Sequence, residues 1–232
     1  MWEKIISNFD KYSREARLFP AALDCLPLYI LVISFTDLFP EVNTYLKLFF
    51  GLALSSIFAY LASDLVRNVG KALEEKVFGN EMSFPTTELL LHSNDRFSNE
   101  KKKKVYEKIK KDFNITLSTT HQESTDIKEA RKKIKEAIGV IRQRLGDGRL
   151  LLKYNIRYGF WRNLCAVAPF AFGASIAVFL VLITVVHSPT YAILSLIIAP
   201  FYLFLWIKSE NVLKYFGYQY AEQFYLEYLS SK

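Results

Sequence analysis

The sequence predicts an all-α membrane protein in which four transmembrane helices form two hairpins that flank a helical, basic cytoplasmic domain. Three features of the 232-residue chain lead to this fold class. Apolar residues gather in one block near each end, and charged residues gather between the blocks. Each block is long enough for two spans and contains a short proline turn. The 30 basic residues lie almost entirely outside the blocks and give the chain a net charge of +7.

The average composition conceals this distribution, because 51% hydrophobic and 23% charged residues also suit a soluble domain. Cys25 and Cys165 are too few for a disulfide framework or a metal site, so we expect them to be small packing residues. His92 and His121 lie far apart, and the chain has no phosphate-binding loop or nucleophile motif. We therefore expect no catalytic site, metal or cofactor, and predict that the protein is not an enzyme.

Residues 1–19 are predicted to form an amphipathic helix. Apolar side chains such as Trp2, Ile5 and Phe9 recur near helical spacing, and basic residues lie between them. Aromatic rings at headgroup level with basic side chains in water are typical of a helix in the membrane interface. The alternative is a helix that packs on the cytoplasmic domain.

Residues 20–65 form the first predicted hairpin. Its first span, 21–39, has about 19 residues, which is the length needed to cross a bilayer. Asp24 and Asp37 lie near the two ends of this span, where a carboxylate reaches the headgroups at modest cost. Pro40 then ends the helix, and the short turn around it makes the second span an antiparallel neighbour.

Residues 66–164 form the predicted basic cytoplasmic domain. Gly79 suits the end of a helix that continues from the second span. A threonine-capped helix is expected after Pro85, and Ser98 is expected to cap the next one. Residues 114–124 are rich in Ser and Thr and are expected to form a loop.

The last long helix of this domain is predicted over residues 126–145, with Ser124 or Thr125 as its N-terminal cap. Its isoleucines form one apolar stripe, and Lys and Arg occupy the remaining surface. Gly146 ends the helix, and the segment 149–164 leads into the membrane.

Residues 165–208 form the second predicted hairpin, with a short turn at Pro189 and a kink at Pro200. Residues 209–232 form a last amphipathic helix with one aromatic face. That face suits either the membrane surface or the cytoplasmic domain, and the sequence leaves both open.

The distribution of basic residues predicts the orientation. Every Lys and Arg except Lys47 and Lys208, the last residue of the second hairpin, lies in the N-terminal segment, the central domain or the C-terminal tail. With four spans these three regions share one side, and positively charged segments face the cytoplasm. We therefore expect both termini and the central domain in the cytoplasm, with only two short turns outside.

Two groups of residues could receive an anionic ligand. The first is the basic surface of the central domain, which suits anionic lipid, oligonucleotide or nucleotide, although a solvated helix face explains it equally well. The second is residues 155–163, where amide, guanidinium and aromatic side chains suit a stacked base and a bound phosphate. The alternative is a belt of aromatic and cationic residues at the membrane surface. The basic surface comprises Lys101–Lys104, Lys108, Lys110, Lys111, Arg131–Lys133 and Lys135.

Two stretches of sequence support a family resemblance. Residues 84–92, Phe-Pro-Thr-Thr-Glu-Leu-Leu-Leu-His, and residues 154–164, Tyr-Asn-Ile-Arg-Tyr-Gly-Phe-Trp-Arg-Asn-Leu, resemble motifs of small bacterial membrane effectors of anti-phage defence loci. The most similar is the Hailong-type channel effector, although Tyr154 and Trp161 depart from its pattern. The motif similarity covers about a quarter of the chain.

The resemblance implies a bacterial inner-membrane protein that assembles as a tetramer. It also implies a nucleotide or short oligonucleotide signal, made by a nucleotidyltransferase encoded nearby. Together with the second group above, it nominates a set of ligand-binding candidates: Thr86, Thr87, His92, Arg96, Asn155, Arg157, Tyr158, Arg162 and Asn163.

The predicted function is a homo-oligomeric ion channel. One chain has too few polar residues in its apolar runs to conduct alone, whereas an oligomer can line a central path with one helix per subunit. The competing interpretation is a non-conducting membrane-anchored sensor or adaptor that binds a protein or nucleic acid. The predicted pore face lies on the second span: Gly51, Ser55, Ser56, Tyr60 and Ser63.

Overall fold

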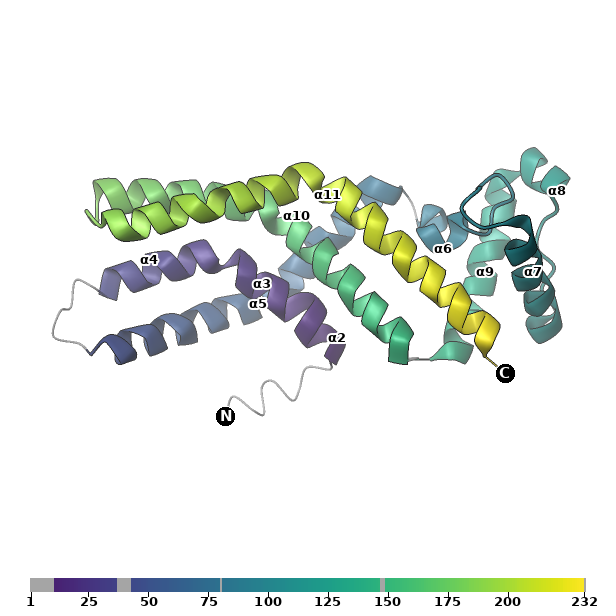
Figure 1. Cartoon of the computed structure of the whole chain (residues 1–232), viewed down its shortest axis with the longest axis horizontal. Coiled ribbons are helices and arrows are strands. Elements are labelled where there is room, and N and C mark those ends of the chain that lie inside the picture. The colour runs from purple at the N-terminus through teal and green to yellow at the C-terminus, as the bar shows by residue number, and fades with distance from the viewer. Residues whose placement is uncertain (1–10, 37–42, 80, 147–148, 232) are drawn as a thin grey trace. The chain divides into compact units, whose positions relative to one another are not determined.

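The computed structural model describes residues 11–36, 43–79, 81–146 and 149–231 (Figure 1). These residues form helices and connecting segments without any strand, which confirms the all-α prediction. Most of the predicted N-terminal helix and the turn at Pro40 lie outside the described residues. The same holds for a few side chains within helices: Thr36, Thr44, Lys47, Phe50, Ser55, Glu81 and Arg149.

The N-terminal half begins with three short consecutive helical pieces and continues with two longer helices. These are α2 (Lys11–Ser13), the π-helical turn η1 (Arg14–Leu18), α3 (Phe19–Asp24), α4 (Leu26–Thr36) and α5 (Thr44–Phe78). The rest of the chain is η2 (Glu81–Ser83), α6 (Pro85–Glu88), α7 (Asn99–Phe113), α8 (Thr120–Thr125), α9 (Ile127–Leu145), α10 (Arg149–Thr184) and α11 (Pro189–Ser230).

The chain divides into two compact units. The apolar unit comprises Met1–Leu73 and Gly159–Val212, and the polar unit comprises Glu74–Tyr158 and Leu213–Lys232. The helices α5, α10 and α11 each continue without interruption from one unit into the other. The polar unit therefore combines the central part of the predicted cytoplasmic domain with most of the C-terminal segment.

Within the part of the chain that the structure describes, two helices are long and apolar enough to cross a membrane, namely α10 and α11. Their apolar halves lie side by side (Figure 1), and the Ser195 hydroxyl donates a 2.8 Å hydrogen bond to the Ser175 carbonyl. Large apolar side chains such as Phe170, Ile197 and Ile207 are exposed on them, which suits contact with lipid. At about 1.5 Å per residue, the 36 residues of α10 and 42 of α11 exceed the hydrocarbon thickness.

A third candidate span is broken. Residues 11–24 and 26–35 together pass the same length and hydropathy criteria, but the helix bends by 50° at Cys25. The sequence predicts one continuous helix over 21–39, and that prediction is wrong at the bend. Pro27 explains the break, because it has no N–H to continue the hydrogen-bond ladder.

The core of the polar unit lies between α7, α9 and the C-terminal part of α11. Leu89, Ile109 and Ile134 are fully buried in it, together with the aromatic face of α11. That face consists of Tyr220, Phe224, Tyr225 and Tyr228. The C-terminal helix therefore packs on the polar domain, which settles the choice that the sequence left open.

Three local predictions for the polar unit are confirmed and three are wrong. Gly79 follows the last residue of α5 as expected, whereas the threonine cap expected after Pro85 is wrong, because Phe84 is the N-cap of α6 and Thr86 and Thr87 lie inside that helix. Ser98 caps α7 by accepting from the Lys101 N–H, and Gly146 follows the last residue of α9. The expected loop over 114–124 contains α8 instead, which begins with a capping box between Thr119 and Gln122. The N-cap of α9 is Asp126, whose carboxylate accepts two backbone N–H groups, rather than Ser124 or Thr125.

Candidate functional site

The most distinctive site of the apolar unit is built on a backbone carbonyl. Pro20 stands four residues after Ala16, where an α-helix would supply an N–H donor for the Ala16 carbonyl. Asn163 of α10 replaces that donor, because its Nδ2 lies 2.5 Å from the Ala16 oxygen. Asn163 is fully buried, so this hydrogen bond joins α10 to the π-helical turn without access to water.

A second carbonyl is satisfied in the same way. Pro27 stands four residues after Leu23 and supplies no N–H to the Leu23 oxygen. The hydroxyl of Tyr202 on α11 donates to that oxygen at 2.6 Å, and the side chain of Tyr202 is fully buried. Pro20 and Pro27 thus each leave one backbone carbonyl without an N–H donor. A side chain of α10 donates to the first carbonyl and a side chain of α11 donates to the second.

Glycines allow the backbones to approach at this site. A Cβ on Gly159 would lie 2.8 Å from the Tyr12 hydroxyl and 2.9 Å from the Ala16 Cβ. A Cβ on Gly70 would collide with the Asn163 Oδ1, which also accepts from the Arg162 Nε at 3.2 Å. Small residues at such crossings are the usual means of close helix packing in membranes.

Asp24, the last residue of α3, is buried in the apolar unit. It is 8% exposed, and within the described part of the chain neither carboxylate oxygen has a hydrogen-bond partner. Cys165 of α10 and Tyr202 of α11 lie near enough to interact electrostatically with it. The expectation that Asp24 reaches the lipid headgroups is therefore wrong, because the carboxylate points into the protein.

The two motif stretches meet inside the polar unit. The ring of Phe84 packs edge-on against the ring of Tyr158 at a centroid distance of 5.5 Å. The Tyr225 hydroxyl donates to the Thr86 carbonyl at 2.5 Å, and the Tyr158 hydroxyl donates to Glu74 at 2.7 Å. Thr86 and Thr87 are 2% and 1% exposed, so in this conformation both side chains belong to the core.

His92 belongs to a buried polar cluster that holds the segment after α6. Its backbone N–H and that of Ser93 donate to the Glu123 carboxylate at 2.8 and 2.9 Å. Burial acts to raise the pKa of Glu123, but these two donors, the Ser93 side chain and the charge of the His92 ring together hold the pKa below the ordinary value. On the same segment, the ammonium group of Lys102 donates to the carbonyls of His92 and Asn94.

The remaining ligand-binding candidates differ in exposure. Arg96 is exposed, with its guanidinium 3.8 Å from the centroid of the Tyr218 ring and 3.9 Å from Glu222. Arg157 is exposed and Asn155 is half-buried. Arg162 is 8% exposed and lies in the apolar unit. Of the nine candidates, Arg96 and Arg157 are the two that this conformation presents to solvent, and the ligand-binding role of the set stays a prediction.

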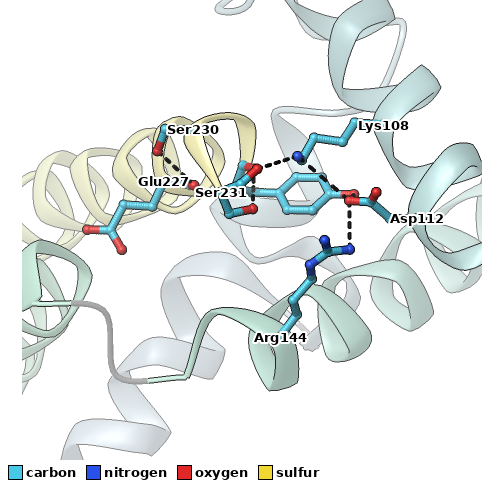
Figure 2. Close-up of polar contacts among 7 residues, drawn as sticks. Lys108, Asp112, Arg144, Glu227, Ser230 and Ser231 are labelled. Atoms are coloured by element: carbon cyan, nitrogen blue, oxygen red, sulfur yellow. Dashed lines mark hydrogen bonds and ion pairs between the residues drawn. The ribbon is translucent and has the colours of Figure 1, made fainter.

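Several residues of the predicted basic surface are engaged within the polar unit. Lys102 is buried, and Arg131 pairs with Glu88 while donating to the Met82 carbonyl. Figure 2 shows that Lys108 and Arg144 both reach Asp112, at 3.8 and 3.0 Å. Lys108 also donates to the Ser231 carbonyl at 2.6 Å, which ties the end of α11 to α7.

Four exposed basic side chains of α9 form an ordered row. Lys128, Lys132, Lys135 and Arg142 recur every three to four residues, with Gly139 at the position between the last two. This spacing places them on one side of the helix, opposite its buried isoleucines. We call these four residues the α9 basic row. The exposed carboxylates Glu129 and Glu136 flank it.

The predicted pore residues of α5 differ in exposure. Gly51 and Ser63 are buried, whereas Ser56 and Tyr60 are exposed. The hydroxyls of Ser56 and Ser63 donate to carbonyls of their own helix. Ser56 also borders an apolar cavity of about 430 Å³ that α3 and α4 line from the other side. The side chain of Ser55 lies outside the described residues.

Sequence reasoning missed the carbonyl sites and the buried state of Asp24. A usable signal was present, because Pro20 and Pro27 bracket Asp24 at intervals of three to four residues within an apolar run. Such prolines create carbonyls that need side-chain donors.

No protein-family model, curated protein or solved structure matches this chain.

Proposed function

We propose that the protein is a homo-oligomeric ion channel of the bacterial inner membrane that acts as an effector of anti-phage defence. In this proposal, four spans form two hairpins, both termini lie in the cytoplasm, and a nucleotide or short oligonucleotide controls the channel. A nucleotidyltransferase encoded nearby would supply the signal. Two candidate spans and a bent third support the membrane part of the proposal.

One observation carries the proposal most directly, namely the continuity of three helices. α5, α10 and α11 contribute residues to both units without a break. On α10, Tyr158 bonds to Glu74 in the polar unit, and five residues later Asn163 bonds to Ala16 in the apolar unit. A displacement or rotation of α10 by a bound ligand would therefore act on the Asn163–Ala16 hydrogen bond through one helix.

The α9 basic row is the surface that suits an anionic ligand best. Four cationic side chains in a line match successive phosphates, whereas the buried candidates Thr86 and Thr87 are inaccessible. Each lysine near an anionic surface contributes about 1 kcal/mol. Moving a channel from mostly closed to mostly open needs about 5.5 kcal/mol of differential affinity, which equivalent sites in a symmetric oligomer can supply together.

Binding is tested with purified full-length protein and a panel of cyclic nucleotides and short DNA or RNA oligomers. We expect heat of binding with at least one compound, and an affinity that falls as salt rises. Replacing Lys128, Lys132 and Lys135 together with Gln is expected to weaken it by roughly a hundredfold, at about 1 kcal/mol per lysine. Unchanged affinity in this variant would remove the α9 basic row from the proposal.

The matched control replaces Lys103, Lys104 and Lys110 of α7, which are exposed basic residues of the same unit. It removes the same charge and is expected to retain most of the affinity. Vesicles of neutral and of anionic lipid separate the two sources of phosphate. If the α9 variant loses vesicle binding but no nucleotide binds the wild type, the row is a lipid-binding surface and the gating proposal fails.

The second candidate function is a non-conducting sensor or adaptor. Two observations favour it. Most predicted ligand-binding residues are buried or half-buried, and the exposed surface of α7 and α9 consists of charged helix faces. Such faces also suit a docked protein. Recording from planar bilayers separates the two functions, because an adaptor produces no current under any ligand.

A further inference from the structure

Asp24 lies at the 50° bend between α3 and α4, in a helix pair that is a candidate broken span. Its carboxylate is buried, and no donor among the described residues bonds to it. The nearby donors are directed to the backbone instead. The Tyr202 hydroxyl donates to the Leu23 carbonyl, and the Cys25 N–H donates to the Ala21 carbonyl at 3.1 Å.

The titratable groups that face Asp24 are thiols and a phenol, which carry no positive charge in either protonation state. They are Cys25 on the same turn, Cys165 of α10 and Tyr202 of α11. On the preceding turns, the guanidinium of Arg17 lies over the Tyr12 ring, 5.6 Å from its centroid. A carboxylate buried without a donor or a counter-ion is strongly disfavoured, whereas the neutral acid is tolerated.

We propose that Asp24 is a proton-binding site of the apolar unit, and that the proton stays bound while the bend is packed against α10 and α11. When water reaches the bend, the carboxyl O–H bond breaks, its electron pair stays on the oxygen, and the proton passes to water. One negative charge per subunit then stands at a bend in a candidate membrane helix. Such a charge retains water and attracts cations.

The site itself is tested by infrared spectroscopy of the full-length protein in liposomes near neutral pH. The wild type is expected to show the C=O stretch of a protonated carboxylic acid, shifted in D₂O and absent from Asp24→Asn. The control is Asp64→Asn, which removes an exposed aspartate of α5 in the same unit and is expected to retain the band. If Asp24→Asn does not assemble, Asp24→Glu is expected to move the band. A band unchanged in every Asp24 variant overturns the proposal, as does the absence of any such band.

The consequence for conduction rests on the proposed channel function. We expect the open probability of the wild type to rise with pH by up to about tenfold per unit for each proton that opening releases, and that of Asp24→Asn to vary far less. If the wild type never conducts but the band is present, the channel proposal fails and the proton site stands. If the wild type conducts while neither the band nor the pH dependence involves Asp24, the proton site fails and the channel stands.

Discussion

Each unit contains a buried carboxylate, and the two carboxylates differ in the hydrogen-bond donors that surround them. Glu123 in the polar unit is 4% exposed and accepts two backbone N–H groups, from His92 and Ser93. Asp24 in the apolar unit is 8% exposed and has no hydrogen-bond donor among the described residues. With nearly equal burial, the difference lies in the donors. The first carboxylate is built to remain ionised and hold a segment in place, and the second is built to change its charge.

Backbone groups outside the regular hydrogen-bond ladder show the same contrast. In the polar unit, N–H groups at helix starts are satisfied locally, by the side chain of Ser98 at α7 and by the capping box at α8. In the apolar unit, two carbonyls that prolines leave without an N–H are satisfied by distant side chains, Asn163 and Tyr202. Local caps survive movement between helices, whereas these two bonds break if α10 or α11 shifts. The apolar unit therefore depends more on helix positions.

The largest effect is expected for Glu123→Ala, which removes the shared acceptor of two backbone N–H groups, that of the half-buried His92 and that of the exposed Ser93. We expect a loss of about 3 kcal/mol, since a hydrogen bond to a charged group contributes about 1.5–3 kcal/mol. Hydrogen exchange at the amides of His92 and Ser93 measures it locally. The exposed Glu136 of α9 is the matched control, and Glu136→Ala is expected to leave both amides protected. Equal protection in the two variants would contradict the contrast between the units.

The same carboxylate predicts a pH dependence in the polar unit. The pKa of Glu123 is lower in the folded state than in the unfolded chain, where it is about 4.3. Its contribution is therefore complete above about pH 4.3 and disappears as pH falls through the lower, folded value. Acid unfolding followed by circular dichroism should show this loss in the wild type and a weaker one in Glu123→Gln. Identical acid midpoints would argue against it.

A somewhat smaller effect is expected for Asn163→Leu in the apolar unit. The substitution leaves the buried Ala16 carbonyl without its donor, at a cost of about 1–3 kcal/mol. Thermal unfolding in detergent measures the change. The control is Asn68→Leu, at an exposed position of α5 in the same unit. If Asn163→Leu is as stable as the control, the carbonyl site does not hold α10 to the N-terminal segment.

Removal of one hydroxyl from each unit sharpens the comparison further. Tyr202→Phe and Tyr225→Phe each delete a buried donor to a backbone carbonyl, so each should cost about 1 kcal/mol. Burial raises the pKa of Tyr225 well above its ordinary value, so its hydroxyl remains a donor at any pH in normal use. In the channel assay, only Tyr202→Phe is expected to alter conduction. An equal effect of Tyr225→Phe would show that the units are not functionally distinct.

The smallest effect is expected at the end of α11. Lys108→Met removes a partly exposed ion pair with Asp112 and the donor to the Ser231 carbonyl. We expect a loss of about 0.5–1 kcal/mol, measured as faster hydrogen exchange in the last turn of α11. Lys103→Met removes a more exposed pair with Glu107 and should have almost no effect. A larger loss from Lys103→Met would reverse this ranking.

The hydropathy and capping patterns were sufficient to predict the helical fold, the apolar helices α10 and α11, and the caps at Ser98 and Gly146. These features depend on residues close together in sequence. The bend at Cys25 was not predicted, although Pro27 signals it, because the length of the apolar run favoured a single span. Helix α8 was missed because Ser and Thr favour both loops and helix caps, and the Thr119 capping box decides between them.

The candidate site was harder to predict, because its properties arise between distant segments. Asn163 was identified from its motif as a ligand-binding residue, but its hydrogen bond to Ala16 spans 147 positions of sequence. Thr86 and Thr87 are polar residues in a short motif, and only the packing of α11 over them makes them buried. The sequence pattern identified these residues as ligand-binding candidates and did not reveal their packing contacts within the protein.

Single-channel recording from planar bilayers that contain the purified full-length protein tests the central claim most directly. A salt gradient across the bilayer gives the ion selectivity, and nucleotides or short oligomers are added on one side only. We expect discrete openings whose frequency changes when the ligand is added on the side of the polar unit. A bilayer that contains correctly assembled protein and shows no openings, with or without any ligand, would contradict it.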